Sequence, residues 1–202
     1  GIGLSVCLLI AMALQYPFST TFPIGPDAPA HIRDALKLTK EYPGDSTGVS
    51  ILARSAYPLS ITLFNTTRIL PISWADRFTW WMAIGHIAVG ISLGLFVYRI
   101  HSWQAAAIGM SIWAPLTMVF NNHFASGTLP QLWSLAFLLL FLERFAAKSV
   151  IWSSILLLII LFSHPITAVL VLLALLIVIP PYWLNRKHFN TQEQRLLQVI
   201  TI

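Results

Sequence analysis

The sequence predicts an all-α fold: a polytopic transmembrane helix bundle, with surface-lying helices in a large first outer loop. The first observation behind this prediction is composition. Of 202 residues, 57% are hydrophobic and only 9% are charged, and the mean hydropathy is +0.76, whereas about a quarter of the residues in a soluble domain are charged. The second is that apolar runs approach the roughly 20 residues needed to cross a bilayer.

Six apolar runs follow one another along a single transmembrane domain that covers residues 1–202. The first occupies residues 1–17, and five more lie within 77–184, at Phe78–Tyr98, Trp103–Phe120, Leu132–Leu142, Val150–Phe162 and Ile166–Ile179. The last two are interpreted as a hairpin that turns at Pro165. The alternative is one long kinked helix from Val150 to Ile179, which would move the basic residues after it to the other side.

Basic residues in the short connections orient these runs. Arg99, Arg144 and Lys187 lie in three such connections, and short loops rich in Lys and Arg stay on the cytoplasmic side. The outer side then receives residues 18–76, the connection "NNHFASGTLP" at 121–130, and His164. Trp74, Trp80 and Trp81 are expected at the outer interface, and Tyr182 and Trp183 at the inner one. This places the protein in the plasma or inner membrane with its active face outside.

The ends of the sequence indicate a fragment of a longer protein. It opens inside an apolar run, and residues 185–202 are expected to form a cytoplasmic loop and the start of another helix. The net charge of +5 is dispersed along the chain. Since several of the basic residues flank apolar runs, they indicate membrane lipids as partners, not nucleic acid.

Two amphipathic helices are expected in the outer loop, residues 18–76. Asp27 can cap the first, because Asp is favoured at helix N-termini and Pro29 is tolerated in an early turn. The second is expected to begin at "YPLSITLFNTTRIL", with Pro58 in its first turn.

Three polar clusters fall on the predicted outer side. They are Asp27 with His31, Asn121 with Asn122 and His123, and Ser163 with His164. Asp27 and His31 are four residues apart, a spacing that puts both on one face of a helix. Each cluster also has an ordinary interpretation, as a helix cap, a solvated loop or a turn.

Other site types find little support in the sequence. It has no glycine-rich phosphate loop and no zinc motif, and its single cysteine, Cys7, excludes an intramolecular disulfide. His86 lies in the middle of an apolar run, where an ionisable residue invites a functional role. A neutral histidine bonded to a neighbouring helix is the preferred interpretation.

The layout resembles the GT-C fold of membrane glycosyltransferases, the superfamily of protein mannosyltransferases and lipid A aminoarabinose transferase. Those proteins place an acidic residue just after the first span, in a large outer loop, where this chain has "IGPDAPAHIRDAL" followed by "AYPLSITLF". "ADRFTWWMAIGHIAVGISLGLFVYRI" resembles the next span. "GTLPQLWSLAFLLLFLERF" and "LLIILFSHPITAVLVLLALL" resemble the short helix pairs that follow. The Asp-x-Asp pair of such enzymes is absent, since Asp27 is followed by Ala28 and Pro29.

The resemblance implies transfer of a sugar from a polyprenyl-phosphate donor to an acceptor at the outer face. Asp27 would be the catalytic base, and His31 would orient it, bind phosphate or share a divalent metal ion with it, if a metal is used at all. The substrate-binding residues implied are Arg33, Arg54, Asn122, His123 and His164. The alternative function is a carrier or lipid flippase fragment without covalent chemistry, and a structural subunit of a membrane complex stays open.

Overall fold

The fold is known from a computed structural model, which describes residues 1–19, 28–38, 58–120 and 129–184. Within these ranges every regular element is a helix and no strand occurs. The all-α class predicted from the composition and the apolar runs is therefore confirmed for the described part of the chain.

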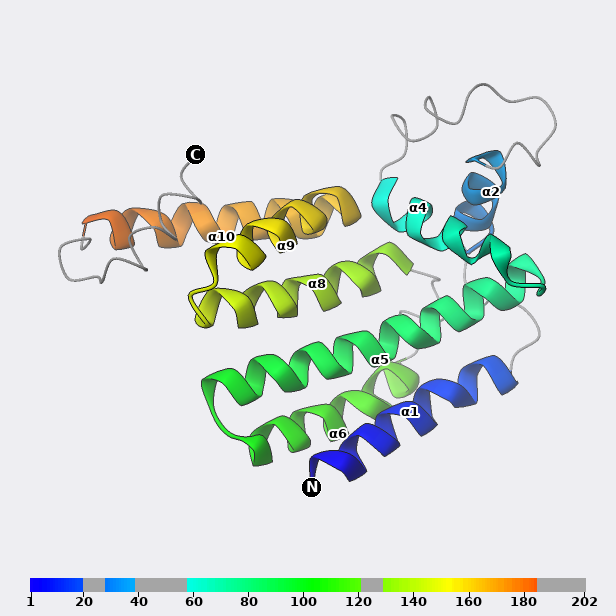
Figure 1. Cartoon of the computed structure of the whole chain (residues 1–202), viewed down its shortest axis with the longest axis horizontal. Coiled ribbons are helices and arrows are strands. Elements are labelled where there is room, and N and C mark those ends of the chain that lie inside the picture. Colours follow the sequence, from blue (N-terminus) through cyan, green and yellow to red (C-terminus); the bar gives the residue numbers. More distant parts are fainter. Residues whose placement is uncertain (20–27, 39–57, 121–128, 185–202) are drawn as a thin grey trace.

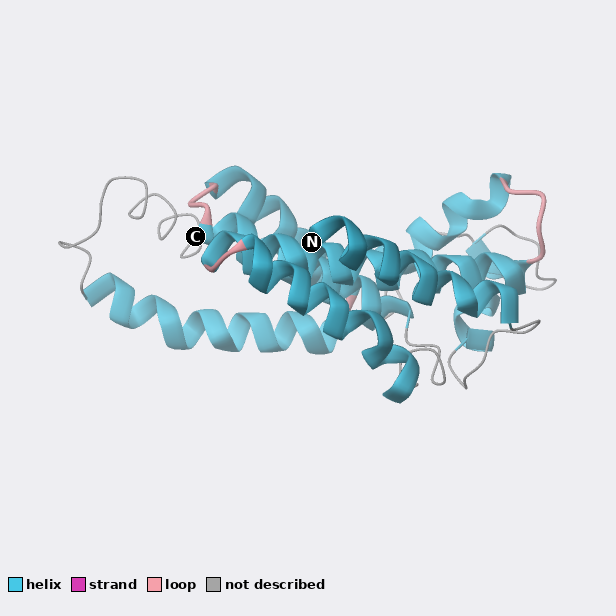
Figure 2. Ribbon diagram, turned by 90° about the horizontal axis from the view of Figure 1, so that it is seen from below, coloured by secondary structure: helices cyan, strands magenta, loops and turns pink. Residues whose placement is uncertain are grey.

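Long apolar helices run side by side and alternate in direction along the molecule (Figures 1 and 2). These are α1 (Ile2–Ser19), α5 (Trp74–Ile100), α6 (Trp103–Phe120), α8 (Leu129–Ala146), α9 (Val150–Ser163) and α10 (Pro165–Leu184). Two short helices, α2 (Ala28–Leu38) and α4 (Pro58–Thr66), lie at one end of this bundle, and α4 continues into the 3-10 turn η1 (Thr67–Ile69). Both occur where the sequence predicts helices in the first loop.

The central helix is α5, which packs against α1, α6 and α8. It begins after Ser73, whose hydroxyl oxygen accepts a hydrogen bond of 3.1 Å from the backbone N–H of Asp76, as an N-cap residue does. Its buried face joins the main core cluster, which combines residues of α4, α5 and α8: Phe64, Phe78, Met82, Val89, Leu132 and Ala136.

Three glycines let the neighbouring helices approach α5 closely. A Cβ atom at Gly85 would lie 2.9 Å from Leu132 of α8, and one at Gly94 would lie 2.7 Å from the sulfur of Met110 in α6. At Gly90 a Cβ would lie 2.5 Å from Leu9 of α1. Small residues at such contacts are typical of helix packing in membranes, where the absence of a side chain brings backbones together.

The last two helices form the predicted hairpin rather than one kinked helix. His164 leaves the helical region, with φ −156° and ψ 118°, and ends α9. Pro165 then opens α10, a position where proline is favoured because its missing N–H would be unpaired anyway. α10 runs back beside α9, which it contacts (Figure 1).

α8 extends beyond the apolar run predicted for it, Leu132–Leu142. It begins with Leu129 and Pro130, since proline fits the first helical turn. It continues past Glu143, because that carboxylate is buried with charged partners instead of ending the helix.

One helix in the described part of the chain, α5, is long and apolar enough to cross a membrane, judged by length and composition. The most apolar stretch of α5 is 44% buried inside the protein. A helix at the core of a soluble protein would also meet a criterion of length and composition. Three shorter apolar stretches accompany it, at Ile2–Gln15, Val150–Ser163 and Pro165–Ile177.

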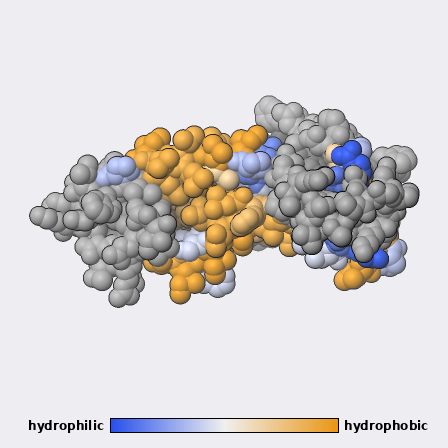
Figure 3. Space-filling model, turned by 90° about the horizontal axis from the view of Figure 1, so that it is seen from above, coloured by the Kyte–Doolittle hydropathy of each residue, from blue (hydrophilic) through white to orange (hydrophobic). Residues whose placement is uncertain are grey.

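Apolar side chains also cover much of the bundle surface. Figure 3 shows a broad hydrophobic area across the middle of the molecule. On α9 and α10 the exposed apolar residues include Ile151, Leu158, Leu170 and Ile177, each more than half exposed. Contiguous apolar surface of this kind marks contact with lipid or with another protein.

Candidate functional site

The candidate site is the end of the bundle that carries α2 and α4. The alternating helix directions bring the end of α1, the starts of α5 and α8, and the α9–α10 turn to this end (Figure 1). α4 contacts α2, α8 and α9, and α2 also contacts α5. The bundle thus gathers at one end the helix termini next to all three polar clusters named in the sequence.

Four of the predicted site residues lie outside the described residues: Asp27, Arg54, Asn122 and His123. In the sequence Asp27 directly precedes α2, and Asn122 and His123 lie between α6 and α8. The proximity of these residues to one another stays a prediction, as does the capping of α2 by Asp27.

The short helix α2 carries two of the predicted residues, His31 and Arg33. The Arg33 guanidinium Nε lies 3.4 Å from the Asp34 carboxylate, and the two side chains are 54% and 30% exposed. An exposed ion pair at this distance contributes little to stability, so Arg33 can turn to an anionic ligand at small cost. α4 lies between α2 and the α9–α10 turn (Figure 1), and it contacts both α2 and α9.

His164 is buried at the turn and caps the following helix. Its Nδ1 accepts a hydrogen bond of 3.3 Å from the backbone N–H of Thr167, and it lies 3.1 Å from the Thr167 hydroxyl. Burial lowers the pKa of His164 below its ordinary value, since desolvation disfavours the charged ring. The neutral ring therefore fills the N-cap position of α10, which is the turn interpretation open from the sequence.

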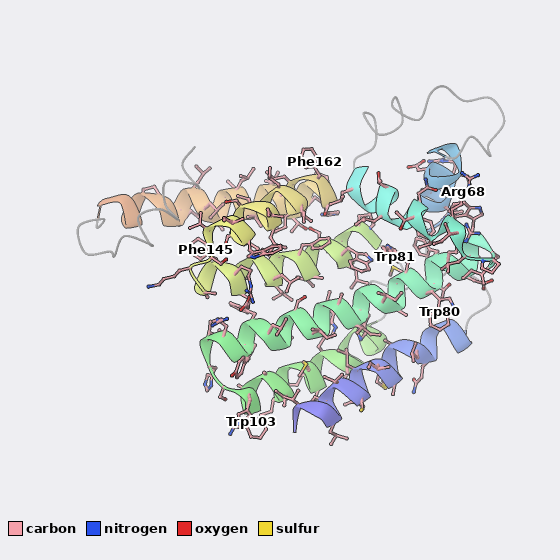
Figure 4. The ribbon with its side chains drawn as sticks, viewed as in Figure 1. Arg68, Trp80, Trp81, Trp103, Phe145 and Phe162 are labelled. Atoms are coloured by element: carbon pink, nitrogen blue, oxygen red, sulfur yellow. The ribbon has the colours of Figure 1, made fainter. Side chains whose placement is uncertain are left out.

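A further cation at this end is Arg77, at the start of α5. Its Nη2 donates a hydrogen bond of 2.8 Å to the carbonyl oxygen of Leu70, and its Cζ lies 4.5 Å from the Trp74 ring centroid. Its Nε is buried without a hydrogen-bond acceptor among the described residues. Arg68, on η1, is an exposed basic residue at the same end (Figure 4).

Among the buried side-chain polar atoms without a described partner, the Ser153 hydroxyl lies in the first turn of α9, near the opposite end of the bundle, and the others lie towards this end. They include the indole nitrogens of Trp81 and Trp133, the hydroxyl of Ser134 and the amide oxygen of Asn65. The two indole rings stack, with centroids 4.8 Å apart (Trp81 is labelled in Figure 4). Since buried polar groups are nearly always hydrogen-bonded, such atoms indicate a place that water or a ligand completes. Trp74 and Trp81 are partly buried and pack against the core cluster, and their expected place at the outer interface stays a prediction.

His86 lies in the interior of the bundle, fully buried in the middle of α5. Its ring stacks on Trp113 of α6 with centroids 5.4 Å apart, and the Trp113 indole N–H donates a hydrogen bond of 3.1 Å to the His86 carbonyl oxygen. The interpretation preferred from the sequence is a neutral histidine bonded to a neighbouring helix. The ring does contact the neighbouring helix α6, but the hydrogen bond from Trp113 is accepted by the His86 backbone and not by its ring.

The described residues contain no group of three or more His, Cys, Asp or Glu side chains that could hold a metal ion. Comparisons with protein-family models, with curated proteins and with solved structures find no match to this chain.

Proposed function

We propose that this chain belongs to a membrane glycosyltransferase that moves a sugar from a polyprenyl-phosphate donor to an acceptor at the α2–α4 end. The observation that carries the proposal is the gathering of helix termini at this end. Arg33, Arg77 and His164 belong to helices or turns at this end. Two helix termini next to predicted site residues also lie here: the start of α2, which follows Asp27, and the end of α6, which precedes Asn122. Sites built from loops on a rigid helical scaffold are common in enzymes.

The membrane part of the proposal has separate support. α5 is long enough to span a bilayer, and the apolar outer faces of α9 and α10 fit lipid better than water. α9 has 14 residues, or about 21 Å at 1.5 Å per residue, so it would cross only where the bilayer thins or helices stop short of the far interface. We therefore infer a multi-pass bundle in the plasma or inner membrane, with the α2–α4 end outside.

The proposed reaction is a substitution at the anomeric carbon of the donor. The acceptor hydroxyl oxygen attacks that carbon, the bond to the phosphate oxygen breaks, and polyprenyl phosphate leaves with the bonding electrons. Asp27 takes the hydroxyl proton as the general base. The leaving phosphate gains negative charge, which nearby arginines stabilise, and Arg33 is an exposed cation at this end that can do so.

A second candidate function, a carrier without covalent chemistry, is favoured by one observation. His86 is fully buried within α5, and ionisable residues inside transmembrane helices often mark transport pathways. Its stacking on Trp113 gives it a packing role that needs no transport. Transport sites also tend to lie near the bilayer midplane, whereas the charged residues described in this chain lie towards the two ends of the bundle.

The test is sugar transfer by the full-length protein carrying Asp27→Asn. Asparagine keeps the shape and the capping ability of Asp27, but it cannot take a proton. Transfer from a polyprenyl-phosphate sugar should fall roughly 10²–10⁴-fold, the usual contribution of a general base, with little change in thermal stability.

The matched control is Asp34→Asn on the same helix, which removes a carboxylate that pairs only weakly with Arg33. It should keep most of the activity. Full transfer by the Asp27→Asn variant would leave Asp27 as a helix cap and remove the proposed base. No transfer by the unsubstituted protein, combined with His86-dependent substrate movement across vesicles, would favour the carrier.

A further inference from the structure

A buried carboxylate lies at the opposite end of the bundle. The Glu143 side chain, in the last turn of α8, is 3% exposed. Its Oε1 accepts a hydrogen bond of 3.0 Å from Nε of Arg99, in the last turn of α5, and its Oε2 is paired with Nε of Arg144. Both carboxylate oxygens thus bind guanidinium groups, and α5 and α8 are joined by charge.

The two arginines keep binding capacity beyond this carboxylate. Their side chains are 45% and 39% exposed, and each uses its Nε on Glu143. Within the described ranges, no acceptor bonds to the Nη groups of Arg99 or Arg144. Two guanidinium groups against one carboxylate leave a net positive charge, held in a fixed place by a buried partner.

The surroundings of this pair are basic as well. His101 and Lys148 are exposed at the same end, and Glu143 is the only acidic residue between positions 77 and 184. Lys148 also adopts a left-handed backbone with φ 57°. It closes α8 in a turn where the Ser149 N–H bonds the Arg144 carbonyl and the Lys148 N–H bonds the Phe145 carbonyl.

Glycine is the residue favoured at this helix C-terminal position, because other residues are strained there. A lysine in this strained conformation is a reason to look for a function.

Aromatic and apolar groups next to the basic cluster fit a lipid. Tyr98 and Trp103, which flank Arg99 and His101, are 59% and 49% exposed (Trp103 is labelled in Figure 4), as aromatic residues at a headgroup layer are. A half-open pocket of about 250 Å³ lies between α1, α5 and α6, lined by apolar side chains including Ile2, Leu95, Tyr98 and Met110. It can receive part of an acyl chain.

We propose that Arg99 and Arg144, clamped by Glu143, form a binding site for the phosphate headgroup of an anionic phospholipid. Basic pockets between transmembrane helices on the cytoplasmic side are the usual place for such headgroups. Lys148 adds charge to the site from the α8–α9 turn. This inference depends on the proposed membrane embedding, but it is independent of sugar transfer.

The test uses the purified protein in nanodiscs of phosphatidylcholine with increasing amounts of phosphatidylglycerol. The readouts are the melting temperature and the phosphatidylglycerol retained in native mass spectrometry. Phosphatidylglycerol should stabilise the protein and remain bound to it. Each basic charge near a membrane surface is worth about fivefold in affinity, so Arg144→Gln and Lys148→Gly should each weaken retention by at least about that factor.

Lys148→Gly keeps the test independent of folding. Glycine relieves the left-handed strain, so the protein should be at least as stable in phosphatidylcholine while it retains less phosphatidylglycerol. Arg68→Gln, at the other end of the bundle, removes the same charge and should leave retention unchanged.

Three results would overturn the proposal. In the first, Arg68→Gln and Lys148→Gly weaken retention equally, which makes the effect one of net charge. In the second, soluble glycerol phosphate protects the protein as well as the lipid does, which makes a free anion the ligand. In the third, phosphatidylglycerol has no effect on a protein that labelling shows to span the membrane, which separates this failure from failure of the membrane proposal.

Discussion

The contact between α1 and α5 makes a sharp test of the bundle, through the substitution Gly90→Ala. The new Cβ would lie 2.5 and 2.7 Å from the two Cδ atoms of Leu9 and 3.0 Å from a ring carbon of Trp113. Leu9 is completely buried. Its side chain therefore has little space to move away, and α1 has to shift.

The expected cost follows from these distances. Added methyl groups in a packed core cost about 1–3 kcal/mol, and alanine returns up to about 1 kcal/mol through its better helix propensity. The net loss is then up to about 2 kcal/mol, which for a chain of this size lowers Tm by up to about 8 °C. Gly3→Ala is the matched control, because a Cβ at Gly3 on α1 meets no atom within 4 Å.

The assay is thermal unfolding of the detergent-purified protein at one scan rate, with Leu9→Ala as a partner substitution. Leu9→Ala alone should lower Tm by leaving a cavity. In the Leu9→Ala background, Gly90→Ala should become neutral or stabilising, because the colliding Cδ atoms are gone. If Gly90→Ala leaves Tm unchanged in both backgrounds, α1 does not pack against α5 at this position.

Two further predictions concern histidines. Burial lowers the pKa of His164 below 6.5, so the His164 ring binds a proton more readily in the unfolded chain than in the folded one. The stability that the neutral ring contributes is therefore present above pH 6.5 and is lost as pH falls through the folded-state pKa. On acidification, Tm should drop less for His164→Asn than for the unsubstituted protein, because asparagine still accepts a hydrogen bond from the Thr167 N–H and does not titrate. An equal drop in Tm for the two proteins would rule out His164 as the cap of α10. Trp113→Phe keeps an aromatic ring beside His86 but removes the hydrogen bond to the His86 carbonyl oxygen. It should lower the stability by about 1 kcal/mol, measured as a Tm that falls by a few degrees. An unchanged Tm would indicate that this hydrogen bond makes no net contribution to stability.

The apolar helices could be predicted well because each long apolar run is a local feature of the sequence, and polar or proline-containing connections mark where it ends. The run Trp103–Phe120 has the same bounds as α6, and the proline after His164 marked the hairpin turn. Pro at the first helical position and Thr167 two residues later could also have indicated that His164 caps α10.

The burial of Glu143 was missed because "FLERF" places it beside Arg144, where it resembles a solvated loop residue. Its partner Arg99 lies 44 positions away, and no local pattern reveals such a contact. The available signal was its isolation as the one acidic residue in positions 77–184. The candidate site could be predicted only as far as the end of the bundle, because contacts among its residues depend on the long connections and not on helix periodicity.

The central claim is that the bundle crosses a membrane with its α2–α4 end outside. Single-cysteine labelling in intact cells tests it most directly, in a Cys7→Ser background, with Ile69→Cys on η1 and Gln104→Cys at the start of α6. Both positions are exposed, and they lie at opposite ends of the bundle. A membrane-impermeant maleimide should label position 69 in intact cells and position 104 only after permeabilisation. Labelling of both positions from outside, or of position 104 alone, would contradict the account.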